Sequence, residues 1–245
     1  MTPSDKEQKM PIWTRRAALG GLAALAASGA TAAEALNTLS AAERKQGWRL
    51  LFDGTDLKGW KVYNKSIIPP QWTVEDGTLT LTKGGAGDLM TIDEFVDFDL
   101  RIDWKISPKG NSGVVYHVKE APDLAQTYYT GPEMQVLDNE GHADGKNPSH
   151  RAGAIYDLVV PTGAVTKPVG EWNQARVVVR KGHIEHWLNG VKVAESSYGD
   201  EAWRKLVAGS KFKQWPQFGR SLSGHIALQD HGDRVWYRNI KIKKL

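Results

Sequence analysis

Cysteine is absent from this chain of 245 residues, and several familiar catalytic motifs are absent with it. Without cysteine there are no disulfide bonds and no thiolate-bound metal ions. No glycine-rich phosphate loop follows an expected strand, and no serine lies in a nucleophile elbow. The chain also contains no internal repeat and no linker rich in proline, glycine or serine. These absences argue against a disulfide scaffold, a P-loop nucleotide enzyme, an α/β-hydrolase and a repeat protein.

A strong excess of charge of one sign is also missing. The sequence has 32 Lys and Arg residues against 28 Asp and Glu residues, a net charge of +4. The one cluster of lysines, Lys241, Lys243 and Lys244, alternates with apolar residues as the solvated face of a strand does. Nucleic acid is therefore not expected as a partner. The ten tryptophan residues suit either core packing or stacking on a sugar.

The N-terminal segment TRRAALGGLAALAASGATAA has the layout of a secretory signal peptide. Arg15 and Arg16 resemble a twin-arginine signal, and Ala30-Thr31-Ala32 offers a small-residue cleavage site. The apolar run is too short and too rich in alanine and glycine to span a bilayer, which needs roughly 20 apolar residues. We therefore expect a signal peptide over residues 1–33 and a periplasmic or secreted mature chain, residues 34–245, without a membrane span. A membrane-anchoring N-terminal helix is the alternative.

The mature chain has the alternating pattern of β-strands, separated by turn signals such as Asn189-Gly190. Two short helices are expected at 41–46, after a capping box, and at 200–211. Many strands, few helices and no break in the pattern predict an all-β fold, a β-sandwich or jelly roll that forms one domain. The expected strands are 48–52, 72–74, 78–82, 98–106, 113–118, 133–137, 154–159, 175–180, 183–188, 192–196, 225–229 and 235–242.

Strand alternation places polar residues together on one face in two places. In the strand 133–137, Glu133 and Gln135 lie on the side opposite the apolar residues. An exposed carboxylate beside an amide can hold a sugar or take part in proton transfer. Gln229 and His231 repeat this arrangement at the end of the penultimate strand. A solvated outer face is the alternative explanation for both pairs.

Metal-ligand patterns are weaker. His183 and His186 lie on an expected strand, where their spacing does not bring both imidazoles to one ion as it does on a helix. His186, between Ile184 and Leu188, is also explained as a hydrogen-bonded interior residue. The run DNEGHAD, residues 138–144, is rich in oxygen ligands for Ca²⁺, but it lacks the full calcium-loop pattern and suits a turn.

Seven blocks of sequence follow one another between residues 48 and 245. They are LFDG (51–54) with Leu57, Gly59 and Trp60, NSG (111–113), EMQVLD (133–138), GAIY (153–156), EWN (171–173), HWLNG (186–190), and QDHG (229–232) followed by RNI (238–240). In this order the blocks resemble those of the 3-keto-disaccharide hydrolase domain family, formerly a domain of unknown function. The resemblance is specific because it extends over nearly the whole mature chain.

The resemblance implies a concanavalin-like jelly roll, a fold shared by many glucanases and lectins. It also implies cleavage of glycosides that are already oxidised to a ketone at C3 of the sugar. Such a ketone makes the C2 proton acidic, so a carboxylate or imidazole can remove it, and the resulting enolate needs a donor or a cation nearby. The C1 substituent is then expelled and water adds. This route does not need the paired carboxylates of ordinary glycosidases.

From these blocks and the strand faces we predict a hydrolase or lyase in which Glu133 moves the C2 proton. His231 is predicted to assist departure at C1 or to polarise the ketone, because imidazole titrates near neutral pH. No cofactor is assigned, and a divalent cation on the ketone is left open. The expected partner is a 3-keto-glycoside; the alternatives are a non-catalytic carbohydrate-binding module and a structural sandwich on the same fold. The predicted substrate-binding residues are Asn111, Gln135, Tyr156, His186 and Gln229.

Overall fold

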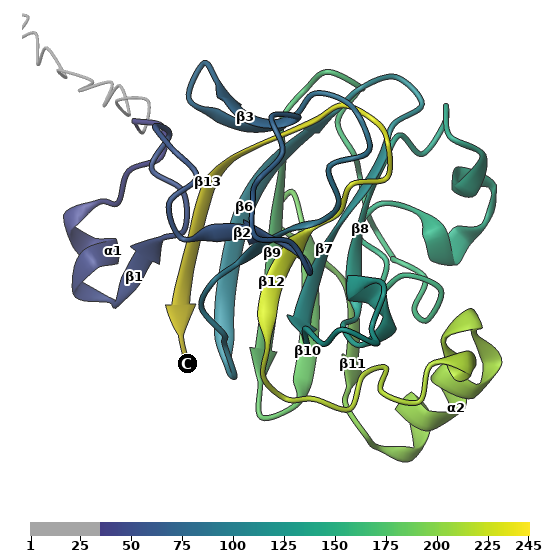
Figure 1. The fold of residues 1–245 in the computed structure, drawn as a ribbon. Helices are drawn as coiled ribbons and strands as arrows, with labels where there is room; N and C mark the ends of the chain where they lie inside the picture. The colour runs from purple at the N-terminus through teal and green to yellow at the C-terminus, as the bar shows by residue number, and fades with distance from the viewer. Residues whose placement is uncertain (1–34) are drawn as a thin grey trace, which may run out of the picture. The chain divides into compact units, whose positions relative to one another are not determined.

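The computed structural model describes residues 35–245, so the predicted signal peptide lies outside the described residues. The described part holds two short α-helices, α1 (Ala41–Lys45) and α2 (Glu201–Gly209), and the strands β1 to β13 (Figure 1). None of the helices described in it is long and apolar enough to cross a membrane.

Two antiparallel sheets form the sandwich, and the predicted all-β class is confirmed. The five-stranded sheet has the order β2 (Trp60–Val62), β5 (Leu89–Thr91), β12 (His225–Leu228), β7 (Asn111–Val118) and β8 (Glu133–Leu137). The eight-stranded sheet has the order β11 (Val191–Ser197), β10 (His183–Leu188), β9 (Asn173–Arg180), β6 (Phe98–Ile106), β13 (Val235–Lys244), β4 (Thr78–Leu81) and β3 (Trp72–Glu75), with β1 (Trp48–Leu50) paired to β13.

The core lies between the two sheets and follows the alternation of their strands. On β6, for example, Leu100, Ile102 and Trp104 are buried in it. The predicted hairpin between β10 and β11 forms because Asn189 and Gly190 both have positive φ, 50° and 85°. These two angles match a tight turn whose twist continues that of the strands.

The five-stranded sheet is buried on both faces around β7, β8 and β12. A second apolar cluster, which includes Tyr63, Met90 and Val115, covers part of the face that points away from the core. Glu133 and Gln135 therefore do not form the exposed pair that strand alternation suggested. They share a face as predicted, but they are only 4% and 1% exposed.

Two strands were not predicted, and one predicted strand is absent. The strands β2 and β5, each of three residues, were missed because so short a run shows no clear alternation. The predicted strand 154–159 is a turn, because Asp157 has a φ of 56° and the N–H groups of Leu158 and Val159 both donate to the carbonyl oxygen of Ile155. Its first residues still hydrogen-bond to the edge of β8, which explains the strand-like sequence.

Both predicted helices are present, and each begins at a capping residue. Ser40 accepts a hydrogen bond from the backbone N–H of Glu43 and completes a capping box before α1. Asp200 caps α2 by accepting from the backbone N–H of Trp203, whose side chain is buried. A short 3₁₀ helix, η4 (Lys211–Gln214), follows α2 and brings Lys211 to the site described next.

Candidate active site

A cavity of about 290 Å³ opens on the face of the five-stranded sheet that points away from the core, and we call it the cleft. Strand residues form its floor, and the loops that follow β12 and precede β5 and β8 form its walls. The cleft brings together six of the seven residues predicted for the site: Asn111, Glu133, Gln135, Tyr156, Gln229 and His231.

Glu133, the first residue of β8, turns its carboxylate into the cleft. The carboxylate lies over Gly113 of the neighbouring strand, where a Cβ atom would come within 1.9 Å of its Oε1. Glycine at position 113 therefore makes room for the carboxylate. No hydrogen bond reaches this carboxylate from residues 35–245, and burial raises the pKa of Glu133 to about 8, since the charged form loses its solvation.

Lys211 is the positive charge that opposes this rise in the pKa of Glu133. Its ammonium Nζ lies 4.3 Å from the ring centre of Tyr156 and 5.3 Å from that of Tyr128, so two aromatic faces hold it at the rim of the cleft. Its backbone N–H donates to a carboxylate oxygen of Asp157 over 2.9 Å. The side chain thus adds a positive charge to a cleft whose buried groups are acidic or neutral.

A second buried carboxylate, Asp88, lies in the same cleft. Its oxygens accept from the hydroxyl of Thr127 over 2.5 Å and from the backbone N–H of Asp230 over 2.8 Å. Burial raises the pKa of Asp88 to about 6 despite these hydrogen bonds. Asp88 is held in place by them, whereas Glu133 is free to bond to a ligand.

Two buried amides in the cleft have polar atoms without a partner in the described part of the chain. They are Oδ1 of Asn111 and Nε2 of Gln135, and the two residues are 2% and 1% exposed. Buried polar atoms are nearly always hydrogen-bonded in folded proteins. These unpartnered polar atoms therefore point to a ligand that can form hydrogen bonds with both amides, as a sugar does through its hydroxyl groups.

Tyr156 forms the wall beside Glu133. Its backbone N–H donates to the carbonyl oxygen of Glu133 over 3.0 Å, and its ring stacks on His150 with 4.3 Å between the ring centres. Its hydroxyl donates to Asp144 over 3.2 Å, and burial together with the charge of Asp144 raises the pKa of Tyr156 far above its usual range. Tyr156 thus lines the cleft as a fixed, neutral phenol.

The loop Gln229-Asp230-His231-Gly232 forms the opposite wall, and its residues have separate tasks. The Asp230 carboxylate accepts from the backbone N–H groups of Ala86 and Gly87 over 2.7 and 2.9 Å, so it ties this loop to the segment before β5. Gly232 has a φ of 106°, which glycine adopts without strain. His231 is exposed at the rim, and Gln229 is nearly buried beside the floor.

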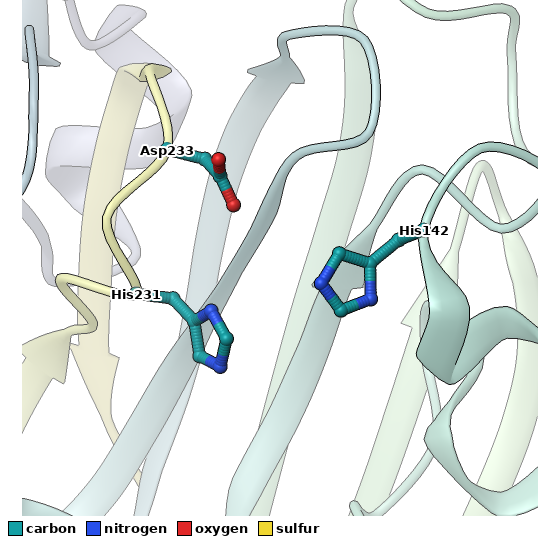
Figure 2. A group of neighbouring side chains, drawn as sticks. All are labelled: His142, His231 and Asp233. Atoms are coloured by element: carbon teal, nitrogen blue, oxygen red, sulfur yellow. The ribbon is translucent and has the colours of Figure 1, made fainter.

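One group of side chains with the spacing of metal ligands lies at the edge of the cleft. His142, His231 and Asp233 each offer a ligand atom, and these atoms lie within 4.8 Å of one another (Figure 2). The run 138–144, which supplies His142, is a turn. Asp138 accepts backbone N–H groups from Lys109 over 2.7 Å and Gly141 over 3.0 Å, so both its oxygens are in use.

The structure does not place His186 in the cleft. The imidazole is fully buried between the sheets, where Nε2 lies 3.0 Å from the hydroxyl of Tyr116 and Nδ1 lies 3.1 Å from the carbonyl oxygen of Gly153. Burial lowers the pKa of His186 to about 4, so it is neutral at physiological pH. His186 therefore does not line the cleft, contrary to the prediction, and instead links the two sheets.

Five residues that line the cleft were not predicted for the site from the sequence. Most lie in loops and 3₁₀ turns, where no alternation assigns a face to a side chain. Asp230, inside the block QDHG, is the one with a recognisable signal, but its side chain holds a loop. The five residues are Asp88, Gln126, Tyr128, Lys211 and Asp230.

Fold and cleft together define a jelly-roll protein with a polar, partly acidic ligand cleft on one sheet. Residues 47–243 match the family described as the 3-keto-alpha-glucoside-1,2-lyase-like domain, and the chain belongs to this family. Membership confirms the predicted family and places the chain among glycoside-cleaving hydrolases and lyases.

Similar proteins come from Bacteroides thetaiotaomicron and Parabacteroides distasonis. A 3-keto-disaccharide hydrolase of Bacteroides thetaiotaomicron is 36% identical over 228 residues, which cover 81% of this chain and 79% of that protein. A solved structure from Parabacteroides distasonis, of a presumed glycosyl hydrolase, superposes with a TM-score of 0.81 at 36% identity and covers 86% of this chain and 100% of that one. A second such structure from the same species has a TM-score of 0.60 at 30% identity and covers 81% of this chain and 99% of that one.

Proposed function

We propose that this chain is an exported enzyme that cleaves 3-keto-glycosides by removing the C2 proton, eliminating the C1 substituent and adding water. The observation that carries this proposal is the buried, unpartnered carboxylate of Glu133 in a cleft of amides. The family and the 36% identical 3-keto-disaccharide hydrolase support the choice of substrate class.

Glu133 is the proposed base. Its ionised carboxylate takes the C2 proton, and the electron pair of the C–H bond forms a C2–C3 double bond while the C3 carbonyl becomes an enolate oxygen. When the carbonyl forms again, the C1–O bond breaks, and the departing oxygen receives a proton. This elimination leaves a C1–C2 double bond, and water then adds across it, with its oxygen at C1 and a proton at C2. A pKa near 8 suits this task, since a carboxylate of low basicity would remove a carbon-bound proton less readily.

The opposite wall supplies the electrophilic side of the reaction. His231 is proposed to polarise the ketone or to assist departure at C1 from the rim. Asn111, Gln135, Gln229 and Tyr156 are proposed to hold the sugar hydroxyl groups through their hydrogen-bonding atoms.

A non-catalytic carbohydrate-binding module is the second candidate function, because this fold also serves binding proteins. The raised pKa of Glu133 favours the enzyme. Burying an unpaired carboxylate costs stability, and a binding module has no need of a proton carrier with such a pKa.

The test is incubation of the purified mature chain with a chromogenic 3-keto-glucoside and with a 3-keto-disaccharide, alone and with added divalent cations. Release of the aglycone and appearance of the 3-keto-sugar are expected. The unoxidised glycosides are the matched control and should remain intact, because their C2 proton is not acidic. Binding of the 3-keto-glycosides without any turnover would favour the binding module.

Lys211→Met is expected to lower kcat/KM mainly at neutral pH. Without the ammonium group the pKa of Glu133 rises further, so a smaller fraction of the base is ionised. We expect kcat/KM of the wild type to rise toward pH 8 and that of the variant to fall by up to about tenfold at pH 7, with a narrower gap at pH 9. A pH profile measures both. Lys211→Arg keeps the charge and should stay close to wild type; an equal loss at every pH would contradict this role.

Export is proposed from the sequence of the N-terminal segment. Replacing Arg15 and Arg16 together by lysine should leave the unprocessed precursor in the cytoplasm, because twin-arginine signals are read through this pair. Fractionation of cells followed by immunoblotting measures the result. Normal processing and export of the double variant would contradict a twin-arginine route.

A further inference from the structure

Three potential metal ligands converge at the rim of the cleft. His142 comes from the turn before the 3₁₀ helix η2 (Ala143–Lys146), and His231 and Asp233 come from the loop before β13. In Figure 2 the two imidazoles and the carboxylate point into one region between these loops, and their ligand atoms lie within 4.8 Å of one another. A modest closure of the loops brings them to the spacing that a single divalent ion requires.

Asn111 positions two of the three groups. Its backbone N–H donates to Asp233 over 3.0 Å, and its side-chain Nδ2 lies 3.4 Å from Nε2 of His231. The buried Oδ1 of the same amide has no partner in residues 35–245. Exchanging the positions of the amide oxygen and nitrogen, which differ little in size, lets Oδ1 accept a hydrogen bond from the Nε2–H group of His231. That arrangement leaves Nδ1 of His231 unprotonated and free to bind a cation, because the other ring nitrogen of a metal-bound histidine usually donates its N–H to a fixed acceptor.

His142 has to give up one contact to bind. Its Nδ1 accepts the backbone N–H of Asp144 over 3.1 Å, which places the ring proton on Nε2. Binding through Nε2 moves this proton to Nδ1 and breaks the hydrogen bond from Asp144. His142 is therefore the ligand whose local structure changes on binding.

A second group of one histidine and two carboxylates is a weaker candidate for a metal site, because a lysine already pairs with its carboxylates. His183, Glu185 and Glu195 have similar spacing on the eight-stranded sheet. Lys192 already occupies that group, with Nζ 2.6 Å from Glu195 and 3.8 Å from Glu185. No Lys or Arg is paired with Asp233 within residues 35–245, so the charge at the rim is available to a cation.

The geometry points to a site for one divalent transition-metal ion at His142, His231 and Asp233, with open positions turned toward the cleft. Two imidazoles and one carboxylate suit Zn²⁺, Co²⁺ or Mn²⁺ better than Ca²⁺, which prefers six to eight oxygen ligands. Because His231 also lines the cleft, the open positions face a bound sugar. On the basis of the proposed function, the ion takes the C3 keto oxygen and stabilises the charge that develops there.

Isothermal titration calorimetry with CoCl₂ and ZnCl₂ tests the site in the absence of substrate. The mature chain, freed of any affinity tag and treated with EDTA, should take up one equivalent of metal. His142→Gln and Asp233→Asn should each weaken the affinity for the metal ion by about 10- to 100-fold. His183→Gln is the matched control and should bind as the wild type does. Thermal unfolding of each variant checks that it is folded. If His142→Gln does not fold, the affinity of Asp233→Asn alone tests the site.

Visible absorption of the Co²⁺-loaded protein tests the open positions. Adding a 3-keto-glucoside should shift the Co²⁺ bands, because an oxygen of the sugar replaces bound water. No stoichiometric uptake by the wild type, or equal affinity in all variants, would overturn the site. Metal uptake that follows these variants while 3-keto-glycosides are not turned over would count against the proposed function and leave the metal site supported.

Discussion

Glu133→Gln is expected to lower the turnover of a 3-keto-glycoside by about 10²- to 10⁴-fold and to leave KM close to that of the wild type. Glutamine keeps the shape of the side chain over Gly113 but cannot take the C2 proton. Because no described residue hydrogen-bonds to this carboxylate, the substitution breaks no hydrogen bond of the side chain. Steady-state kinetics at pH 8, where the base is substantially ionised, measures the loss.

Glu201→Gln is the matched control for this loss. The same substitution of glutamate by glutamine is made here on the surface of α2, where the Glu201 side chain is 74% exposed and pairs with Lys205. Exposed pairs of this kind contribute little, so kcat and KM should be unchanged. Near-normal turnover by Glu133→Gln would show that another group removes the proton. Asp88, the other buried carboxylate of the cleft, would then be the next residue to substitute.

The long strands could be predicted from the sequence because their alternation is strong. β6, β8 and β10 begin and end where the pattern predicted, at Phe98–Ile106, Glu133–Leu137 and His183–Leu188. The turn around Asp157 could not be predicted, because its apolar residues fit a strand and only the backbone angles show the reversal. Local pattern fixes the direction of a side chain, whereas tertiary contacts decide where the chain turns.

The site was predictable where it lies on strands and unpredictable where it lies in loops. Glu133 and Gln135 share the cleft because they are two residues apart on β8. Alternation could not show that the loops around them would bury this face, and it could not place Lys211, which a 3₁₀ helix brings to the cleft from 78 positions away in the sequence. The role of His186 could not be predicted either, because a polar residue on a strand can bind a ligand or form hydrogen bonds inside the core. In this protein His186 lies in the core and joins the two sheets.

The unfolding free energy of the wild type and of Glu133→Gln should diverge as the pH rises from about 5 to above 8. The ordinary pKa of this carboxyl is 4.5, and burial raises it to about 8 in the folded chain. Between these values the unfolded chain has released the proton while the folded chain still holds it. The unfolded state therefore binds fewer protons, and the stability that Glu133 contributes below pH 4.5 is lost as the pH rises through the folded pKa.

Glutamine carries no such proton, so Glu133→Gln escapes this loss and should be the more stable protein at high pH, by roughly 2–4 kcal/mol at pH 8.5 and by much less at pH 5. Urea unfolding of both proteins at the two pH values measures the difference. The carboxyl of Asp88, whose pKa is raised to about 6, is present in both proteins, so its contribution cancels. Glu201→Gln should show no such divergence.

If the stability of Glu133→Gln falls with pH as steeply as that of the wild type, Glu133 does not hold its proton in the folded chain, and the base in the cleft is a different group. If instead the variant gains stability while it loses turnover, the same buried carboxylate lowers the stability of the fold and performs the proton transfer.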